Sequence, residues 1–197
     1  MDTTTTAVEW AMTELVRNRE AMDRVGEELM TSDFNQNSAG SESVLSGLPY
    51  LNACIKETLR LHPPVPLLVP HSAPQACKLM GYTVPKNSTV FVNVWAMGRD
   101  PAIWEDPLVF KPERFLGSDL EFKGFDFEFL PFGSGRRICP GMTMGCKQVV
   151  WILANLIHCF QWSLPDGQSS EDLDMSDKLG VTLKKKQPLV LIPKIRF

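Results

Sequence analysis

The sequence predicts a mainly α-helical protein with small β-sheets. Apolar residues recur at helical spacing in several separate segments, and the last of these is long and strongly apolar. Runs of β-branched and alternating residues are short, and Pro, Gly or Asn bounds each of them. A chain of 197 residues with 44% hydrophobic and 22% charged residues has the size and composition of one globular domain.

Residues 1–30 are expected to form two helices. The apolar residues of the first helix are Val8, Ala11, Met12, Leu15 and Val16, and those of the second are Met22, Val25 and Leu29. The run Thr3–Thr6 is a poor helix opening, because β-branched side chains lower helix propensity. This run is either an N-cap cluster or part of a helix that is already running there.

Residues 31–46 are rich in Ser, Asn and Gly, and we expect them to form a flexible connection. Residues 48–62 are predicted to form a helix that ends at Pro63 and Pro64, because proline cannot continue a helix. Pro, Leu and Val dominate residues 63–70, so this segment should be extended and buried.

The second half of the chain begins with a predicted β-hairpin in residues 81–94, with its turn at Pro85–Asn87. Residues 99–131 contain short segments separated by Pro or Gly and show little periodicity. An irregular segment of this length is often functional. Residues 142–160 return to a long apolar helix, and residues 180–197 indicate short strands.

Composition excludes several classes of protein. The formal net charge of -3 provides no basic field for nucleic acid. The five cysteines are an odd number without Cys-x-x-Cys spacing, which argues against a disulfide framework or a zinc ribbon and for a reducing compartment. The sequence shows no signal peptide or membrane anchor, and its longest apolar run, residues 149–157, is too short to span a bilayer. An anchor, if the protein has one, would lie outside this sequence.

The segment Phe132–Gly141, directly before the long apolar helix, carries the strongest chemical signal. A cysteine at this position, Cys139, meets free backbone N–H groups and the partial positive charge of a helix start, and both favour a thiolate. The glycines of the segment allow the backbone to approach a large flat group. The guanidinium of Arg137 suits a carboxylate. Together these features describe a haem with its propionates, whereas an isolated cysteine would more simply be a buried structural residue.

This segment resembles the cytochrome P-450 signature Phe-x-x-Gly-x-Arg-x-Cys-x-Gly at all its fixed positions, which are Phe132, Gly135, Arg137, Cys139 and Gly141. The resemblance implies haem b as cofactor, Cys139 as the iron ligand and the other four residues as parts of the haem site. It also implies that residues 1–197 form a single partial domain, the C-terminal portion of the cytochrome P-450 fold. In that fold, residues 99–131 would be the meander, 132–141 the haem-cysteine loop and 142–160 the helix behind the haem.

A second block, Glu57-Thr58-Leu59-Arg60, resembles the Glu-x-x-Arg sequence of the same family. Residues three apart share one face of a helix and can pair, although such a pair is commonly a solvated surface feature. The block Pro112-Glu113-Arg114-Phe115 resembles the family segment whose arginine joins this pair. The resemblance therefore implies a buried structural triad of Glu57, Arg60 and Arg114.

The resemblance also gives the first residues a function. Asp2-Thr3-Thr4 resembles the end of the family's Gly-x-Asp-Thr-Thr sequence. Residues 1–30 would then hold the end of the central oxygen-activating helix and the helix that follows it. Thr3 would be the oxygen-activating hydroxyl, and Asp2 would be the acid of the proton relay.

Further segments resemble plant microsomal members, and the tail resembles the branch that includes geraniol and other terpenoid hydroxylases. The substrate would be a small lipophilic metabolite that contacts the apolar residues Leu67, Leu68, Val69, Leu179 and Val181. Neighbouring branches act on phenolics and alkaloids. His71 would hydrogen-bond a haem propionate or serve as a structural histidine.

The resemblance implies a monooxygenase that uses O2 and receives electrons from NADPH through cytochrome P-450 reductase. Full-length members sit on the cytoplasmic face of the endoplasmic reticulum membrane, held by an N-terminal anchor. We expect the 197-residue chain alone to fold poorly and to be inactive. Two alternatives remain open: a truncated, non-catalytic product or pseudogene fragment, and a peroxide-rearranging member of the same fold. The second is disfavoured by Asp2 and Thr3.

Overall fold

The computed structural model describes residues 2–32, 34 and 47–196. It confirms the predicted fold class, because helices dominate and each sheet of the described residues has two antiparallel strands. The predicted connection at residues 31–46 lies largely outside the described residues. No helix of the described part of the chain is long and apolar enough to span a membrane.

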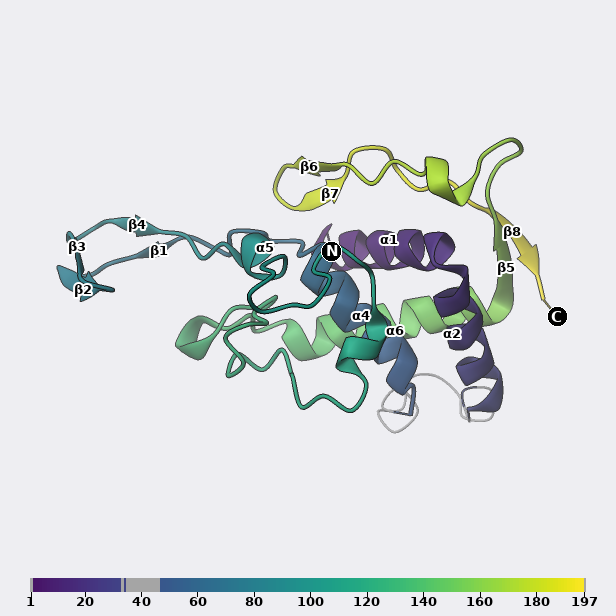
Figure 1. The fold of residues 1–197 in the computed structure, drawn as a ribbon, viewed down its shortest axis with the longest axis horizontal. Helices are drawn as coiled ribbons and strands as arrows, with labels where there is room; N and C mark the ends of the chain where they lie inside the picture. The colour runs from purple at the N-terminus through teal and green to yellow at the C-terminus, as the bar shows by residue number, and fades with distance from the viewer. Residues whose placement is uncertain (1, 33, 35–46, 197) are drawn as a thin grey trace.

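Figure 1 shows α1 (Asp2–Arg17) and α6 (Met142–Cys159) side by side, with α4 (Pro49–Leu61) crossing them. The helix α2 (Arg19–Thr31) turns away from α1 at Asn18, whose side-chain amide donates to the Glu14 carbonyl over 2.8 Å. The core lies where these helices meet. Its fully buried apolar side chains include Trp10, Leu15, Val25, Leu51 and Leu153.

The helix α4 starts one residue later than predicted and has no side-chain cap of its own. Glu28 of α2 replaces that cap: its carboxylate accepts from the backbone N–H of Tyr50 at 2.7 Å and of Leu51 at 2.9 Å. These two N–H groups have no partner within the helix, and a negative charge is favoured at a helix start. The contact fixes α2 against α4.

The sheet pairing differs from the predicted hairpin in residues 81–94. The strand β2 (Cys77–Leu79) pairs with β3 (Tyr82–Val84), whereas β4 (Thr89–Val90) pairs with β1 (His71–Ser72). The prediction was wrong because the tight turn precedes β3, at Met80 and Gly81, where φ is positive. The turn at Pro85–Asn87 exists, but the strand that follows it, β4, pairs with β1 and not with β3.

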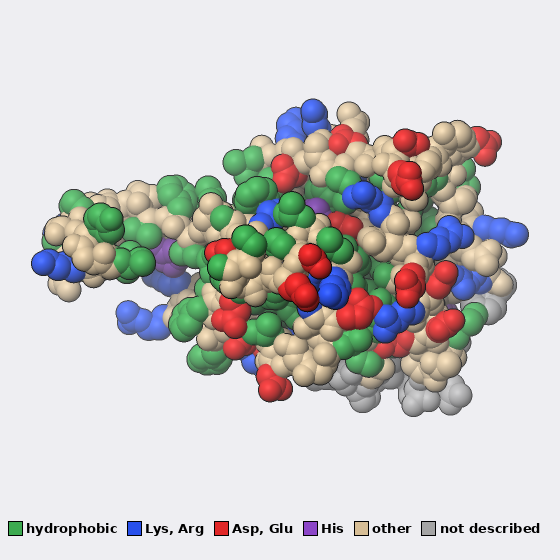
Figure 2. Space-filling view, in the orientation of Figure 1, with side chains coloured by type: hydrophobic (Ala, Val, Ile, Leu, Met, Phe, Trp, Pro, Cys, Tyr) green, Lys and Arg blue, Asp and Glu red, His purple; other side chains and the backbone are tan. Residues whose placement is uncertain are grey.

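These four strands form an arm that extends away from the helices in Figure 1. Figure 2 shows apolar side chains gathered along the same arm, and Leu79, Met80, Tyr82 and Phe91 are exposed there. After the arm, α5 (Val94–Met97) is capped by the Asn93 side chain, which accepts from the Ala96 N–H over 3.0 Å. The last residue of the predicted hairpin, Val94, is therefore the first residue of a helix.

The irregular segment predicted at residues 99–131 has turns, the short 3-10 helix η2 (Pro112–Phe115) and little other regular structure. Three aromatic rings, those of Trp104, Phe115 and Phe129, pack against one another with centroids 5.1 to 6.3 Å apart. All three are buried. This aromatic cluster gives the segment a fixed position without helix or sheet.

The chain continues through two more 3-10 helices, η3 (Gly135–Arg137) and η4 (Ser170–Asp172). Two of the strands after α6, at residues 183–185 and 192–195, lie in the tail that the sequence predicts as short strands. The strand β5 (Phe160–Ser163) pairs with β8 (Ile192–Ile195), and β6 (Asp177–Leu179) pairs with β7 (Leu183–Lys185). Figure 1 shows the β6–β7 hairpin along α1.

Candidate functional site

The loop before α6 folds back on itself. The N–H of Cys139 donates to the carbonyl of Phe132 over 2.9 Å, and that of Ile138 donates to the carbonyl of Gly135 over 3.1 Å. Gly135 has a φ of 67°, a conformation that strongly favours glycine. The Ser134 hydroxyl donates to the Gly124 carbonyl over 2.5 Å and ties the loop to the preceding segment.

The loop presents Cys139 at the start of α6. The residue is exposed, and a Cβ atom on Gly141 would stand 3.8 Å from its sulfur. Arg137 lies exposed on η3, two residues before it. Thus Gly135, Arg137, Cys139 and Gly141, which the sequence predicts as parts of one site, lie on one short loop, and Phe132 is half-buried at the beginning of it.

The other cysteines have different surroundings. Cys54 is buried in α4, and Cys77 is exposed on β2, away from any helix start. Burial raises the pKa of Cys146, on α6, to about 12, and the nearby Cys139 and Glu121 raise it as well. Cys146 therefore stays a neutral thiol at pH 7. Among the described residues, Cys139 alone combines an exposed thiol with a helix start.

The single exposed sulfur of Cys139 suits a haem iron better than a metal ion that is held by protein ligands alone. A protein-bound ion needs several ligands, and the described residues contain no group of three or more His, Cys, Asp or Glu that could hold one. A haem iron takes its other ligands from the macrocycle, so one exposed sulfur from the chain is sufficient. On the loop beside Cys139, a Cβ atom on Gly135 would meet no atom within 4 Å.

The three residues predicted as a structural triad form a buried charged cluster. Arg60 donates two hydrogen bonds to the Glu57 carboxylate, from Nε and from Nη2, each 2.8 Å long. Arg114 donates from Nε to Glu57 Oε1 over 3.0 Å. The Glu57 and Arg60 side chains are fully buried, and 9% of the Arg114 side chain is exposed. The geometry excludes a solvated surface pair.

Sequence reasoning missed the residues that complete this cluster. The N–H of Lys111 donates to Glu57 Oε1 over 2.8 Å, and Arg60 donates to the carbonyls of Pro107, at 2.7 Å, and Gly98. A Cβ atom on Gly98 would lie 2.3 Å from the Arg60 carbonyl oxygen, so no side chain fits there. No pattern in the sequence marks this approach, because it joins positions far apart in the chain.

Asp2 and Thr3 lie exposed in the first turn of α1, so the threonine run is part of that helix. The Asp2 carboxylate accepts from Lys184 Nζ over 3.4 Å, and its carbonyl accepts from the Thr5 hydroxyl over 3.0 Å. The structure therefore places an acid and a hydroxyl together at the start of α1, beside the β6–β7 hairpin.

The predicted apolar contacts lie in two segments, and His71 is exposed on β1. In the first segment, Leu67, Leu68 and Val69 follow α4, and a Cβ atom on Gly133 would lie 3.6 Å from Leu68 Cδ1. This segment therefore lies beside the cysteine loop. In the second, Leu179 and Val181 are 65% and 90% exposed at the tip of the β6–β7 hairpin.

The two segments are linked, because the N–H of Leu183 donates to the carbonyl of Pro64 over 2.9 Å. The structure thus brings the hairpin close to the chain that leads to Leu67. Large apolar side chains that are exposed to this extent suit contact with a lipophilic partner or ligand.

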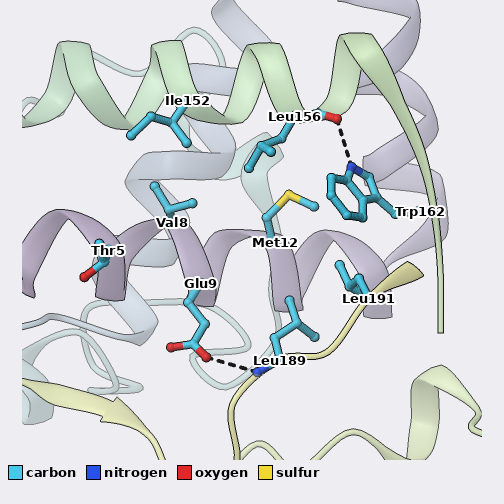
Figure 3. Close-up of a pocket in the computed structure, with 9 residues that line it drawn as sticks. All are labelled: Thr5, Val8, Glu9, Met12, Ile152, Leu156, Trp162, Leu189 and Leu191. Carbon is cyan, nitrogen blue, oxygen red and sulfur yellow. Dashed lines mark hydrogen bonds between the residues drawn. The ribbon is translucent and has the colours of Figure 1, made fainter. Parts of the chain in front are cut away.

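A separate apolar pocket of about 380 Å³ lies between α1, α6 and the C-terminal segment (Figure 3). Its lining residues are Thr5, Val8, Glu9, Met12, Ile152, Leu156, Trp162, Leu189 and Leu191. Glu9 accepts from the Leu189 N–H over 3.0 Å, and Trp162 Nε1 donates to the Leu156 carbonyl over 2.8 Å. None of the predicted site residues lines this pocket.

Comparison with known proteins points to the same family as the cysteine loop, Phe132–Gly141. A sequence model of the family described as cytochrome P-450 matches residues 1–192. Geraniol 8-hydroxylase of Swertia mussotii is 53% identical over 188 residues, which is 95% of this chain and 38% of that protein. A protein named probable (S)-N-methylcoclaurine 3'-hydroxylase isozyme 2, from Coptis japonica, is 48% identical over 195 residues, 99% of this chain and 40% of that protein.

A solved structure supports the same fold. The zebra fish cytochrome P-450 determined with abiraterone superimposes with a TM-score of 0.84 and 32% identity, over 98% of this chain and 44% of that chain. The chain thus spans about two fifths of the length of the curated relatives reported above.

Proposed function

Because the chain belongs to the cytochrome P-450 family, we propose that it is part of a haem-thiolate monooxygenase. This enzyme would hydroxylate a small lipophilic plant metabolite. Dioxygen would be the oxidant, and NADPH would supply electrons through a reductase. The observation that carries this proposal is the exposed Cys139 at the start of α6, on a loop whose glycines permit a close approach. The family match and the fold agree with it.

Haem b is the proposed cofactor, and Cys139 would ligate its iron. Bound haem would supply the oxygen chemistry, since electron release from a thiolate ligand favours cleavage of the O–O bond. Arg137, exposed beside the cysteine, would pair with a propionate through its guanidinium. His71 is a second proposed donor to a propionate. Phe132, Gly135 and Gly141 would shape the loop around the cofactor.

Asp2 and Thr3 would transfer protons to dioxygen at the start of α1. The Thr3 hydroxyl can donate and accept a hydrogen bond, and the Asp2 carboxylate can pass on a proton. Lys184 Nζ donates a hydrogen bond to that carboxylate over 3.4 Å. A buried Glu57, Arg60 and Arg114 cluster would hold the irregular segment that leads to the cysteine loop.

The substrate would be apolar. Leu67, Val69, Leu179 and Val181 are exposed, Leu68 is half-buried, and all five side chains are aliphatic. A terpenoid alcohol fits this set, and a relative that is 53% identical carries the name geraniol 8-hydroxylase. We therefore propose a geraniol-like terpenoid as the substrate class.

The reductase would dock on the side of Cys139, where Arg136 is exposed and Lys147 lies one turn into α6. Positive charge there would attract an acidic partner. We also propose that the complete protein is held at the endoplasmic reticulum membrane by an anchor, as in plant microsomal members of the family. A net charge of -3 gives no support for binding to nucleic acid.

Turnover tests the proposal. The chain, joined to any upstream reading frame found in its transcript, is expressed with haem supply and incubated with geraniol, NADPH and plant cytochrome P-450 reductase. The proposal predicts a hydroxylated product that requires both NADPH and reductase. A product formed from a hydroperoxide without reductase would support the peroxide-rearranging alternative and contradict the proposal. A transcript without an upstream frame, and a chain that does not retain haem, would support the truncated product.

A further inference from the structure

The hairpin formed by β6 and β7 is fastened to α1 by contacts that the proposed chemistry does not use. Trp10 Nε1 donates to the carbonyl of Leu183 over 3.3 Å, and the hydroxyls of Thr6 and Thr182 lie 3.4 Å apart. These four residues are buried. Thr6 and Trp10 stand four positions apart, so they lie on one face of α1.

A cation strengthens this attachment. Lys185 Nζ lies 4.6 Å from the centre of the Trp10 ring, and it also donates to the Asp174 carbonyl. The Lys185 residue is only 6% exposed. A partly desolvated ammonium over an indole face is attracted by the ring quadrupole. The hairpin therefore contacts Trp10 at two places: the Leu183 carbonyl accepts from the indole N–H, and the Lys185 ammonium lies over the ring.

A second side chain, His62, also packs on the same indole. The His62 ring stacks on Trp10 with centroids 3.8 Å apart and an interplanar angle of 3°. His62 Nε2 lies 2.7 Å from Glu14 Oε1, and both residues are buried. Glu14 is four positions beyond Trp10 on α1, so α1 holds the imidazole that fixes the indole. The Trp10 ring thus has little freedom to move.

The hairpin carries two of the proposed substrate contacts. Leu179 ends β6 and Val181 lies in the turn, directly before the buried Thr182. A change in the seating of Thr182 or Leu183 on α1 would move both side chains. Their position relative to Thr3, at the start of the same helix, is therefore set through Thr6 and Trp10.

We propose that Trp10 is a positioning residue for substrate specificity: it seats the β6–β7 hairpin on α1 and so fixes Leu179 and Val181 relative to Thr3. This inference rests on the proposed function only for the role of Leu179 and Val181. The seating of the hairpin follows from the contacts of Trp10 and can be measured without haem.

Hydrogen exchange measures the seating in the same protein that the turnover experiment uses, the chain joined to any upstream reading frame found in its transcript. Trp10→Phe removes the N–H donor but keeps an aromatic ring for His62. The matched control is Trp162→Phe, which removes a donor to the Leu156 carbonyl at 2.8 Å, away from the hairpin. We expect exchange at residues 177–185 to become up to about tenfold faster in Trp10→Phe and to be unchanged in the control. Exchange in residues 149–157 of α6 should stay the same in Trp10→Phe.

Three results of this experiment would overturn the inference. In the first, the hairpin exchanges at the same rate in Trp10→Phe as in the original chain. In the second, α6 loses protection as much as the hairpin does, which would make Trp10 a general core residue. In the third, the hairpin of the original chain exchanges as fast as an unstructured peptide, so that no seating exists.

Ligand binding to the haem-loaded protein provides the second readout. Geraniol is the probe that would reach the hairpin, and imidazole is a small iron ligand that would not. Trp10→Phe should weaken geraniol binding by about three- to tenfold and leave imidazole binding unchanged. Equal weakening of both, or of neither, would contradict the role in specificity. If the original protein fails to bind haem through a thiolate, the proposed function fails, while the exchange experiment still decides the seating.

Discussion

Arg114 donates from Nε to Glu57 Oε1 over 3.0 Å and thereby ties the 3-10 helix η2 to helix α4. The same carboxylate receives Arg60 from its own helix and the backbone N–H of Lys111. One buried acid thus organises the irregular segment that precedes the cysteine loop. Without this acid, two guanidinium groups would share a buried space without a counter-charge.

Removal of the Glu57 charge should therefore be costly. We expect Glu57→Gln to lower the free energy of unfolding by about 3 to 5 kcal/mol, because the two arginines lose their buried partner. The matched control is Glu105→Gln, which breaks an exposed pair with Lys111 at 3.5 Å and should cost less than about 1 kcal/mol. Urea unfolding followed by circular dichroism measures both. Equal effects of the two substitutions would show that the buried cluster contributes no more than a surface pair.

Gly98 should tolerate no side chain. In Gly98→Ala, the new Cβ would stand 2.3 Å from the Arg60 carbonyl oxygen, so backbone must move, and we expect a loss of about 1 to 3 kcal/mol. The control Gly26→Ala lies in α2, where a Cβ has no atom within 4 Å. That variant should gain up to about 1 kcal/mol from helix propensity. A Gly98→Ala protein as stable as the original would contradict the packing described here.

Stability should fall in mild acid because of His62. Burial lowers the pKa of this imidazole, and the nearby Arg99 and Lys185 lower it further, whereas the hydrogen bond with Glu14 and the charge of that residue oppose them. The folded protein then binds a proton less readily than the unfolded chain, whose histidine titrates at a pH of about 6.5. The contribution of His62 to the free energy of unfolding is therefore fully present above that pH. It declines as the pH falls towards the lowered pKa of His62 in the folded protein.

The expected slope in that window is up to about 1.4 kcal/mol per pH unit for one proton. His62→Gln keeps a donor for Glu14 but does not titrate, so it should lose this contribution to the slope. The control His71→Gln changes an exposed histidine on β1 and should keep the slope. Urea unfolding at several values between pH 7.5 and 5 tests this. An unchanged slope in His62→Gln would contradict the buried neutral imidazole.

Much of the helical fold follows from the sequence pattern. The apolar spacing in residues 1–30 predicts α1 and α2, and Pro63 marks the end of α4 to within two residues. The hairpin predicted for residues 81–94 is wrong, because β3 and β4 pair with other strands. Both Gly81 and Pro85 begin plausible turns, and local sequence alone does not show which turn joins two paired strands.

The site divides in the same way. The loop around Cys139 is contiguous in sequence, so its candidate site residues can be predicted from residue types and spacing alone. The pairing of Glu57 with Arg114 and the stacking of Trp10 on His62 join positions far apart in the chain. The first was expected only from a family resemblance, and the second was not foreseen. Spacing on one helix shows which side chains share a face, but not whether the face is buried.

The role of Cys139 as haem ligand is tested most directly by the absorption spectrum of the reduced, carbon monoxide-bound haem protein, compared between Cys139→Ser and Cys77→Ser. Both cysteines are exposed, but only Cys139 stands at the start of α6. If Cys139 ligates the haem iron, the thiolate-type band persists in Cys77→Ser and disappears in Cys139→Ser. A thiolate-type spectrum retained in Cys139→Ser would contradict the assignment of Cys139 as the haem ligand, and with it the proposed function.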